Sequence, residues 1–305
     1  MEPLVTRASA FVISITPFAP DGSFSDELVR AHLRRLRESG IGVYLGGGGS
    51  GEGYALDPGE AARLLEIGVE ELKGAVPVRS MGVEPRTARQ MIDYVAVARR
   101  IGVDATQIYS LDQGHGHRPS TAEIRRYFED ILSAIDLPAV ISTHQSVGYQ
   151  VPVDMLVALA DRYDHVIGIN CSHQDMGYLA AIVDALGDRL DVHVGGPAQA
   201  LTAWALGATG YLCSEGNLIP KTCMRLVDAF KAGDEAATFA TFGTVLRMSM
   251  SLYGAGGIRA TKAVLDALGL PGGPPRLPQL SPNAATVKGL LDLVRSMDLA
   301  DDLAP

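Results

Sequence analysis

The sequence has no apolar segment long enough to cross a membrane, and its amino terminus lacks the features of a secretion signal. Glycine, aspartate or arginine interrupts each of the longest apolar runs well short of the roughly 20 residues that a spanning helix needs. The opening Met-Glu-Pro-Leu-Val-Thr-Arg has no basic segment followed by an apolar run and a cleavage site. These absences predict a cytoplasmic protein that does not bind membranes.

Cysteine and positive charge are also scarce. The cysteines are Cys171, Cys213 and Cys223, and an odd number at such wide spacing indicates neither a disulfide framework nor a Cys-x-x-Cys metal site. Lysine and arginine number 26 against 35 aspartates and glutamates, which gives a formal net charge of −9. Because no basic cluster offsets this balance, we expect no nucleic-acid partner.

Short β-prone segments alternate with amphipathic helical segments through most of the 305 residues. A strand, a helix and two turns together need about the spacing observed between successive strand starts. This alternation predicts a (β/α)8 TIM barrel, whose active site is expected at the carboxyl ends of the strands. A doubly wound open sheet is disfavoured because no Gly-x-Gly-x-x-Gly turn follows the first strand. The predicted strands are residues 11–16, 42–45, 76–81, 105–109, 139–143, 166–170, 191–194 and 210–214.

The alternation stops near residue 233, and the remaining sequence is helical in pattern. Helices are predicted at residues 235–252, 256–268 and 283–297, and the last residues, 298–305, are expected to be frayed. The domain prediction is therefore a barrel over residues 1–232 and a C-terminal α-helical extension over residues 233–305.

A glycine-rich loop, Gly-Gly-Gly-Gly-Ser-Gly-Glu at residues 46–52, follows the second predicted strand. Asp57 and Pro58 then supply an N-cap and a first-turn proline for the next helix. Such a turn directs backbone N–H groups at the space above the strand end, where they commonly bind a phosphate or carboxylate. The alternative interpretation is a flexible loop whose glycines serve turn geometry alone.

Several stretches together resemble the dihydrodipicolinate synthase / N-acetylneuraminate lyase family, in the same order along the chain. They are Thr-Pro-Phe at 16–18, Gly-Gly-Ser-Gly-Glu at 48–52, Leu-Pro at 137–138, Ile-Gly-Ile at 167–169 and Pro-Arg-Leu-Pro at 275–278. The resemblance implies a (β/α)8 barrel with a C-terminal helical extension and a homo-oligomer, dimer or tetramer. It also implies a small-molecule carboxylate as substrate.

The resemblance breaks at the residues that carry the family's chemistry. In the family a lysine follows the Ile-Gly-Ile of strand six and forms a Schiff base with a 2-oxo acid, whereas this sequence has Asn170. An amide nitrogen is not a nucleophile and cannot form an imine. Ser142 stands where a proton-relaying tyrosine is expected, and Tyr109 lies a few residues before the position of the second tyrosine. The resemblance therefore predicts the family's fold without its imine mechanism, and a label of dihydrodipicolinate synthase would be wrong about the activity.

Imidazole and amide groups gather at the predicted strand ends instead. We predict Asn170, His144, His173 and Ser142 as catalytic residues, with a histidine as general acid/base and the amide as a hydrogen-bond donor to an oxyanion. The predicted reaction is aldol-type C–C cleavage or formation, or hydration/elimination, on a small oxo- or hydroxy-acid. The predicted substrate-binding residues are Thr16, Gly49, Ser50, Gly51, Glu52 and Tyr109.

The sequence leaves three alternatives open. No metal or other cofactor is predicted, but a divalent metal held by two or three of His115, His117, His144 and His173 with Glu52 would make the protein a metal-dependent lyase or hydrolase. Lys221, after the last strand, would be a relocated imine lysine, although a surface role is favoured for it and for Lys73, Lys231, Lys262 and Lys288. The third alternative is a non-catalytic carboxylate-binding or regulatory barrel.

Overall fold

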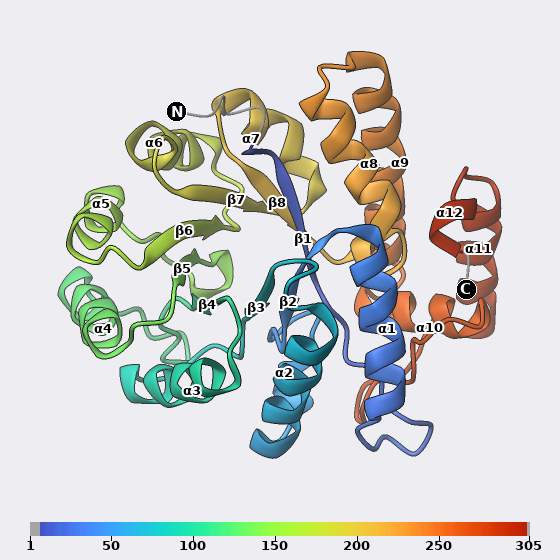
Figure 1. Ribbon diagram of the computed structural model, residues 1–305, viewed down its shortest axis with the longest axis horizontal. Coiled ribbons are helices and arrows are strands. Elements are labelled where there is room, and N and C mark those ends of the chain that lie inside the picture. Colours follow the sequence, from blue (N-terminus) through green and yellow to red (C-terminus); the bar gives the residue numbers. More distant parts are fainter. Residues whose placement is uncertain (1–6, 304–305) are drawn as a thin grey trace. The chain divides into compact units, whose positions relative to one another are not determined.

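The computed structural model describes residues 7–303, and in these residues strands and helices alternate from the amino terminus to α8 (Figure 1). The eight parallel strands pair in chain order, and the sheet closes on itself. This confirms the predicted (β/α)8 barrel. The strands are β1 (Ser9–Ile13), β2 (Gly42–Leu45), β3 (Val78–Ser80), β4 (Ala105–Ile108), β5 (Ala139–Thr143), β6 (Val166–Cys171), β7 (Asp191–Gly195) and β8 (Gly210–Cys213).

Within residues 7–303 an α-helix follows each strand, and four more α-helices come after α8, as the predicted C-terminal helices require. None of the helices described within residues 7–303 combines the length and apolar character needed to cross a membrane. The helices are α1 (Asp26–Ser39), α2 (Pro58–Leu72), α3 (Ala88–Ile101), α4 (Thr121–Ala134), α5 (Val153–Arg162), α6 (Met176–Leu186), α7 (Ala200–Leu206), α8 (Pro220–Lys231), α9 (Glu235–Gly254), α10 (Ile258–Ala267), α11 (Ala284–Arg295) and α12 (Ala300–Leu303).

Local capping explains why the helices begin and end where they do. The Ser25 side chain accepts a hydrogen bond from the backbone N–H of Leu28 at the start of α1, and Gly40 ends that helix with φ 76°. Ser120 and Glu123 form a reciprocal capping box at the start of α4, as their spacing predicts. These caps use residues close in sequence, which is why they could be predicted.

Contacts divide the chain into two compact units. One contains Arg79–Leu212, and the other contains Ser9–Val78 together with the chain from Cys213 onward. The division into residues 1–232 and 233–305 stays a prediction.

The carboxyl terminus differs from the prediction of a frayed tail. Residues 300–303 form α12, and Asp302 is only 1% exposed. Its carboxylate accepts hydrogen bonds from the backbone N–H groups of Lys221 (2.6 Å) and Thr222 (3.2 Å) and from the Thr222 hydroxyl. The tail is ordered because Asp302 satisfies the free N–H groups at the start of α8. Residues 304–305, and residues 1–6 on which the prediction about a secretion signal rests, lie outside the described residues.

Candidate active site

Asn170 lies near the carboxyl end of β6, in the unit that contains Arg79–Leu212. Its side chain is 3% exposed, and its Nδ2 donates a hydrogen bond to Oε1 of Gln107 on β4 at 2.5 Å. The parallel register aligns Asn170 with Ser142 on β5 and with His193 on β7. Since paired residues on neighbouring strands point to the same face of a sheet, Asn170, Ser142 and His193 share one face. The structure therefore brings the predicted Asn170 and Ser142 together.

Cys171 points to the opposite face, as the alternation of side chains predicts. Its Sγ accepts a hydrogen bond from the Thr143 hydroxyl at 3.9 Å, and the side chain is 1% exposed. Burial raises the pKa of the Cys171 thiol. These contacts indicate that Cys171 is a buried structural thiol.

The segment after β5 is held by Ser110, a residue for which the sequence predicted no role. The Ser110 hydroxyl donates to the backbone oxygen of Ser142 (2.7 Å) and accepts from the backbone N–H of His144 (3.1 Å). One buried serine thus fixes the backbone on both sides of Thr143. A serine just after a strand gave no signal that distinguished it from other loop serines.

His144 and His173 lie close enough to influence each other. Burial lowers the pKa of both imidazoles, and a charge on His144 lowers the pKa of His173 further, while Asp175 opposes this shift. His173 is 9% exposed, and its Nε2 has no hydrogen-bond partner among the described residues. Nδ1 of His144 is hydrogen-bonded to the Ser146 hydroxyl. Both imidazoles are therefore biased toward the uncharged form, which can accept a proton.

Tyr109 follows β4 directly and is 4% exposed. Its backbone oxygen accepts a hydrogen bond from the Tyr127 hydroxyl at 2.9 Å, so α4 fixes the main chain at this strand end. The hydroxyl of Tyr127 is occupied in this way, and burial raises its pKa well above the ordinary value.

His115 and His117 lie in the loop after β4, and both side chains are exposed. His115 has a positive φ of 52°, which places it in a tight turn flanked by Gly114 and Gly116. Among residues 7–303, no three of His115, His117, His144 and His173 lie within ligand distance of a common ion. The geometry of the described residues therefore does not favour the metal site suggested for these histidines.

The glycine-rich loop belongs to the other unit, where Thr16 and Glu52 hold it in place. The Thr16 hydroxyl donates to the backbone oxygen of Gly51 at 2.7 Å. Glu52 has φ 52°, and its backbone N–H donates to the Gly49 oxygen at 3.1 Å. A Cβ on Gly51 would lie 2.5 Å from the backbone nitrogen of Gly47, so only glycine fits there. Gly49 is exposed and Ser50 is half-buried, which leaves the tip of the loop open to solvent.

The prediction that Lys262 is a helix-surface residue is wrong. It lies on α10 with a side chain that is 0% exposed, and its Nζ donates to Oε2 of Glu52 (2.5 Å) and to the backbone oxygen of Thr16 (2.9 Å). The Phe18 ring lies 4.5 Å from the ammonium group. Burial lowers the pKa of Lys262 and raises that of Glu52, while their mutual attraction opposes both shifts. The ion pair anchors the last residue of the loop to the C-terminal helices of the same unit.

Lys221, the candidate for a relocated imine lysine, lies in the first turn of α8 and is half-buried. Its backbone N–H is bound to Asp302, so its main chain is fixed. No described contact directs its side chain toward a reactive group, and a role at the helix start accounts for its position.

The fold defines a (β/α)8-barrel protein with polar side chains near the carboxyl ends of its strands. The chain belongs to the dihydrodipicolinate synthetase family, whose model matches residues 7–295. A 4-hydroxy-tetrahydrodipicolinate synthase of Pelobacter propionicus is 29% identical over 232 residues, which cover 74% of this chain and 76% of that protein. An uncharacterized DapA-like lyase of Rhizobium meliloti is 25% identical over 292 residues and 95% of both chains.

Solved structures show the same fold along nearly the whole chain. Dihydrodipicolinate synthase from Bacillus anthracis superposes with a TM-score of 0.87 at 23% identity and covers 95% of this chain and 98% of its own. A prophage protein of the dihydrodipicolinic acid synthase family from E. coli K12, solved in complex with pyruvate, gives a TM-score of 0.85 at 21% identity, with 96% and 99% covered. At these identities the likeness establishes the fold alone.

Proposed function

We propose that this protein is a lyase for small oxo- or hydroxy-acids that works without a lysine Schiff base, and that it is not a dihydrodipicolinate synthase in activity. The observation that carries the proposal is Asn170, an amide hydrogen-bonded to Gln107 at the β6 position where the family resemblance implies the imine lysine. Neither Arg79–Leu212 nor Met1–Ala8, the two segments of this unit, contains a lysine, so no lysine side chain of the unit replaces the missing one.

The predicted catalytic residues supply a different chemistry. His144 or His173, uncharged at neutral pH, would remove the proton from a hydroxyl group on the carbon β to the oxo group of an acid that carries both groups. The freed electron pair forms a carbonyl, the neighbouring C–C bond breaks, and its electrons pass to the oxo-acid fragment as an enolate. Hydrogen bonds from the Asn170 amide and the Ser142 hydroxyl would stabilise the enolate oxygen, and the imidazolium returns the proton. Because Asn170 and Ser142 are almost fully buried, such hydrogen bonds are stronger there than in water.

For the other unit, we propose that the backbone N–H groups of Gly49, Ser50 and Gly51 bind a carboxylate. Two contacts support this role by holding the loop still. Thr16 is bonded to the Gly51 oxygen, and Glu52 is bonded to Lys262. A preorganised loop loses little conformational entropy when it binds its ligand.

The proposal is tested first by ligand binding and then by enzymatic turnover of the ligands that bind. A thermal-shift screen of oxo- and hydroxy-acids identifies ligands by the rise in melting temperature, and those ligands are assayed for cleavage or dehydration. Asn170→Ala and His144→Ala should each fold and should lower kcat by about 100-fold or more. His117→Ala, which changes an exposed histidine of the same unit, is the matched control and should keep full activity. Unchanged kcat in both test variants would contradict the proposal.

The competing function, a non-catalytic carboxylate-binding protein, gives a distinct result in the same screen. Such a protein would bind one of the acids and turn over none of them. We also propose that the chain forms a homo-oligomer, a dimer or tetramer, which light scattering on a size-exclusion column measures directly.

A further inference from the structure

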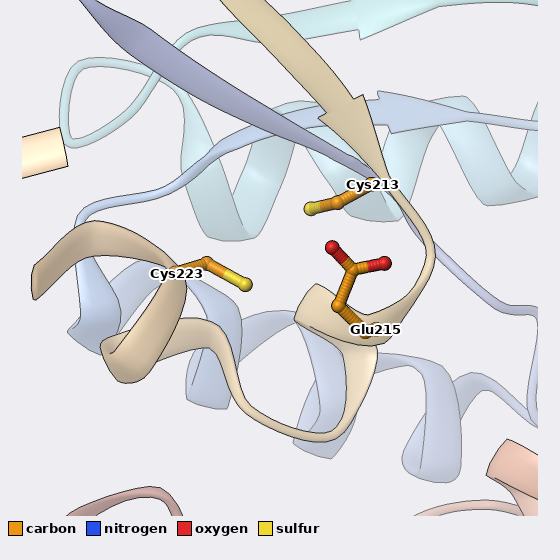
Figure 2. A group of neighbouring side chains, drawn as sticks. All are labelled: Cys213, Glu215 and Cys223. Atoms are coloured by element: carbon orange, nitrogen blue, oxygen red, sulfur yellow. The ribbon is translucent and has the colours of Figure 1, made fainter. Parts of the chain in front are cut away.

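Cys213, Glu215 and Cys223 come together in the unit that contains the C-terminal helices. Cys213 ends β8, Glu215 begins the 3₁₀ turn Glu215–Asn217, and Cys223 lies on α8. One oxygen of Glu215 and the two sulfur atoms all lie within 4.8 Å of one another. Figure 2 shows the carboxylate and both sulfurs directed into the same small volume between the strand end and the helix. Among residues 7–303, no other group of three or more cysteine, histidine and acidic side chains meets this spacing.

The backbone around this cluster is fixed by hydrogen bonds. The backbone oxygen of Glu215 accepts hydrogen bonds from the backbone N–H groups of Leu218 and Ile219, both at 2.9 Å. The Asn217 side chain donates to the oxygens of Ile13 and Ser214 and accepts from the N–H of Ile15, each at 2.9 Å. The position of Glu215 is therefore set before any ligand arrives.

Burial makes this arrangement costly unless a positive charge is present. Cys213, Glu215 and Cys223 are 2%, 1% and 0% exposed, and neither carboxylate oxygen of Glu215 has a hydrogen-bond partner among the described residues. A carboxylate in such surroundings needs a proton or a metal ion to balance its charge.

We propose that Cys213, Glu215 and Cys223 bind a zinc ion. Two thiolates and one carboxylate are ligands that zinc prefers, and sulfur favours zinc over magnesium or calcium. In a tetrahedral zinc site with Zn–S bonds of about 2.3 Å, the two sulfurs lie about 3.8 Å apart, which falls inside the 4.8 Å within which all three ligand atoms already lie. Binding releases the two thiol protons, together with any proton on Glu215, to solvent.

The remaining coordination position would be filled by water, and Ser249 on α9 can support the site. Its hydroxyl is 1% exposed and lies near enough to Glu215 to interact with the carboxylate. Hydrogen bonds of this kind to a ligating carboxylate orient it toward the metal.

The test uses the full chain, treated with a chelator and dialysed against a metal-free reducing buffer. Zinc or cobalt(II) is then added, the bound metal is measured by elemental analysis, and cobalt is followed by its thiolate charge-transfer absorption. The wild type should bind one ion per chain and show this absorption. Cys223→Ser and Glu215→Gln should weaken zinc binding by about 100-fold or more. Cys171→Ser, which changes a buried cysteine outside the cluster, should bind like the wild type.

Several outcomes would overturn the proposal. A folded wild type that binds no stoichiometric zinc while its thiols are kept reduced would do so. Zinc that binds equally well to Cys223→Ser would be adventitious and would also overturn it. The cobalt titration of the wild type decides the question even if a variant does not fold. This site does not depend on the proposed lyase activity, and either proposal can fail without the other.

Discussion

The buried ion pair between Glu52 and Lys262 gives the sharpest prediction about stability. Lys262→Met removes the ammonium group and keeps a side chain of similar length, which can pack against Phe18. The substitution leaves the Glu52 carboxylate, 1% exposed, without its cation. It also removes the hydrogen bond to the backbone oxygen of Thr16. The loop that ends at Glu52 therefore loses its attachment to α10.

The expected loss follows from the burial of the pair. Removing one partner of a fully buried ion pair costs about 3–5 kcal/mol, because an uncompensated charge remains. An unfolding entropy of about 2.1 cal/mol/K per residue gives roughly 0.64 kcal/mol/K for 305 residues. The melting temperature should therefore fall by about 5–8 °C at pH 7. The loss should be smaller at acidic pH, where Glu52, whose pKa burial raises, accepts a proton.

Differential scanning calorimetry of four proteins measures this effect: the wild type, Lys262→Met, Glu52→Gln and the double variant. The double variant should be less destabilised than the sum of the single variants, by about 0.5–3 kcal/mol, because it removes both charges together. A Lys262→Met protein that melts within about 1 °C of the wild type would refute the reasoning. So would strictly additive effects in the double variant.

Three further predictions concern the same unit. Burial, with help from Arg35 and Lys262, lowers the pKa of His32 to about 3 against the opposing hydrogen bond to Asn217, so the folded state favours the neutral ring. The contribution of the neutral His32 ring to the free energy of unfolding is complete above pH 6.5 and should fall by about 1.4 kcal/mol per pH unit as the pH drops toward 3. Urea titrations measure this fall, and a His32→Gln protein whose free energy of unfolding depends on pH as steeply as that of the wild type would contradict the prediction. Asp302→Ala should lower the melting temperature by removing the contacts to the start of α8, and it should speed proteolysis of the tail; unchanged proteolysis would show that these contacts do not order it. Gly51→Ala should disrupt the loop and weaken carboxylate binding in the thermal-shift screen. Gly289→Ala on α11, which has open space around its Cβ and lies outside the loop, is the tolerated control; equal binding by both variants would count against the tight approach of Gly51 to Gly47.

Much of the fold could be predicted because its signals are local. The bounds of β2 and β5 agree with the predicted strands, and Ser25 and Gly40 mark both ends of α1. Hydrophobic patterning and capping residues act over a few positions, so a single sequence contains them. Alternation likewise predicted that Asn170 and Cys171 point to opposite faces of β6.

The wrong predictions concern residues whose hydrogen-bond or ion-pair partners are distant in the sequence. Ala-Asp-Asp-Leu at 300–303 is polar and short, and it is helical because Asp302 binds residues 80 positions earlier. The burial of Lys262 could have been predicted from the sequence, because Lys262 lies four residues after Ile258 and three before Leu265, on the buried face of α10. A lysine at such a position needs a buried acidic partner, and Glu52 lies 210 residues away.

The proposed zinc ligands Cys213, Glu215 and Cys223 could not be predicted from the sequence either. Cys213 and Cys223 are separated by nine residues with no repeat, so their spacing resembles no metal-binding motif. They meet because β8 and α8 are consecutive elements joined by a tight turn that contains Glu215. The topology of a β-α unit brings the three ligands together.

The central claim, catalysis or binding without a lysine imine, is tested most directly by reduction with borohydride in the presence of pyruvate. The protein is incubated with pyruvate, reduced, and examined by intact mass and peptide mapping, with a Schiff-base member of the family as positive control. The claim predicts no mass increase on this chain while the control is labelled fully. A reduced pyruvyl adduct on Lys221, Lys262 or any other lysine would contradict it.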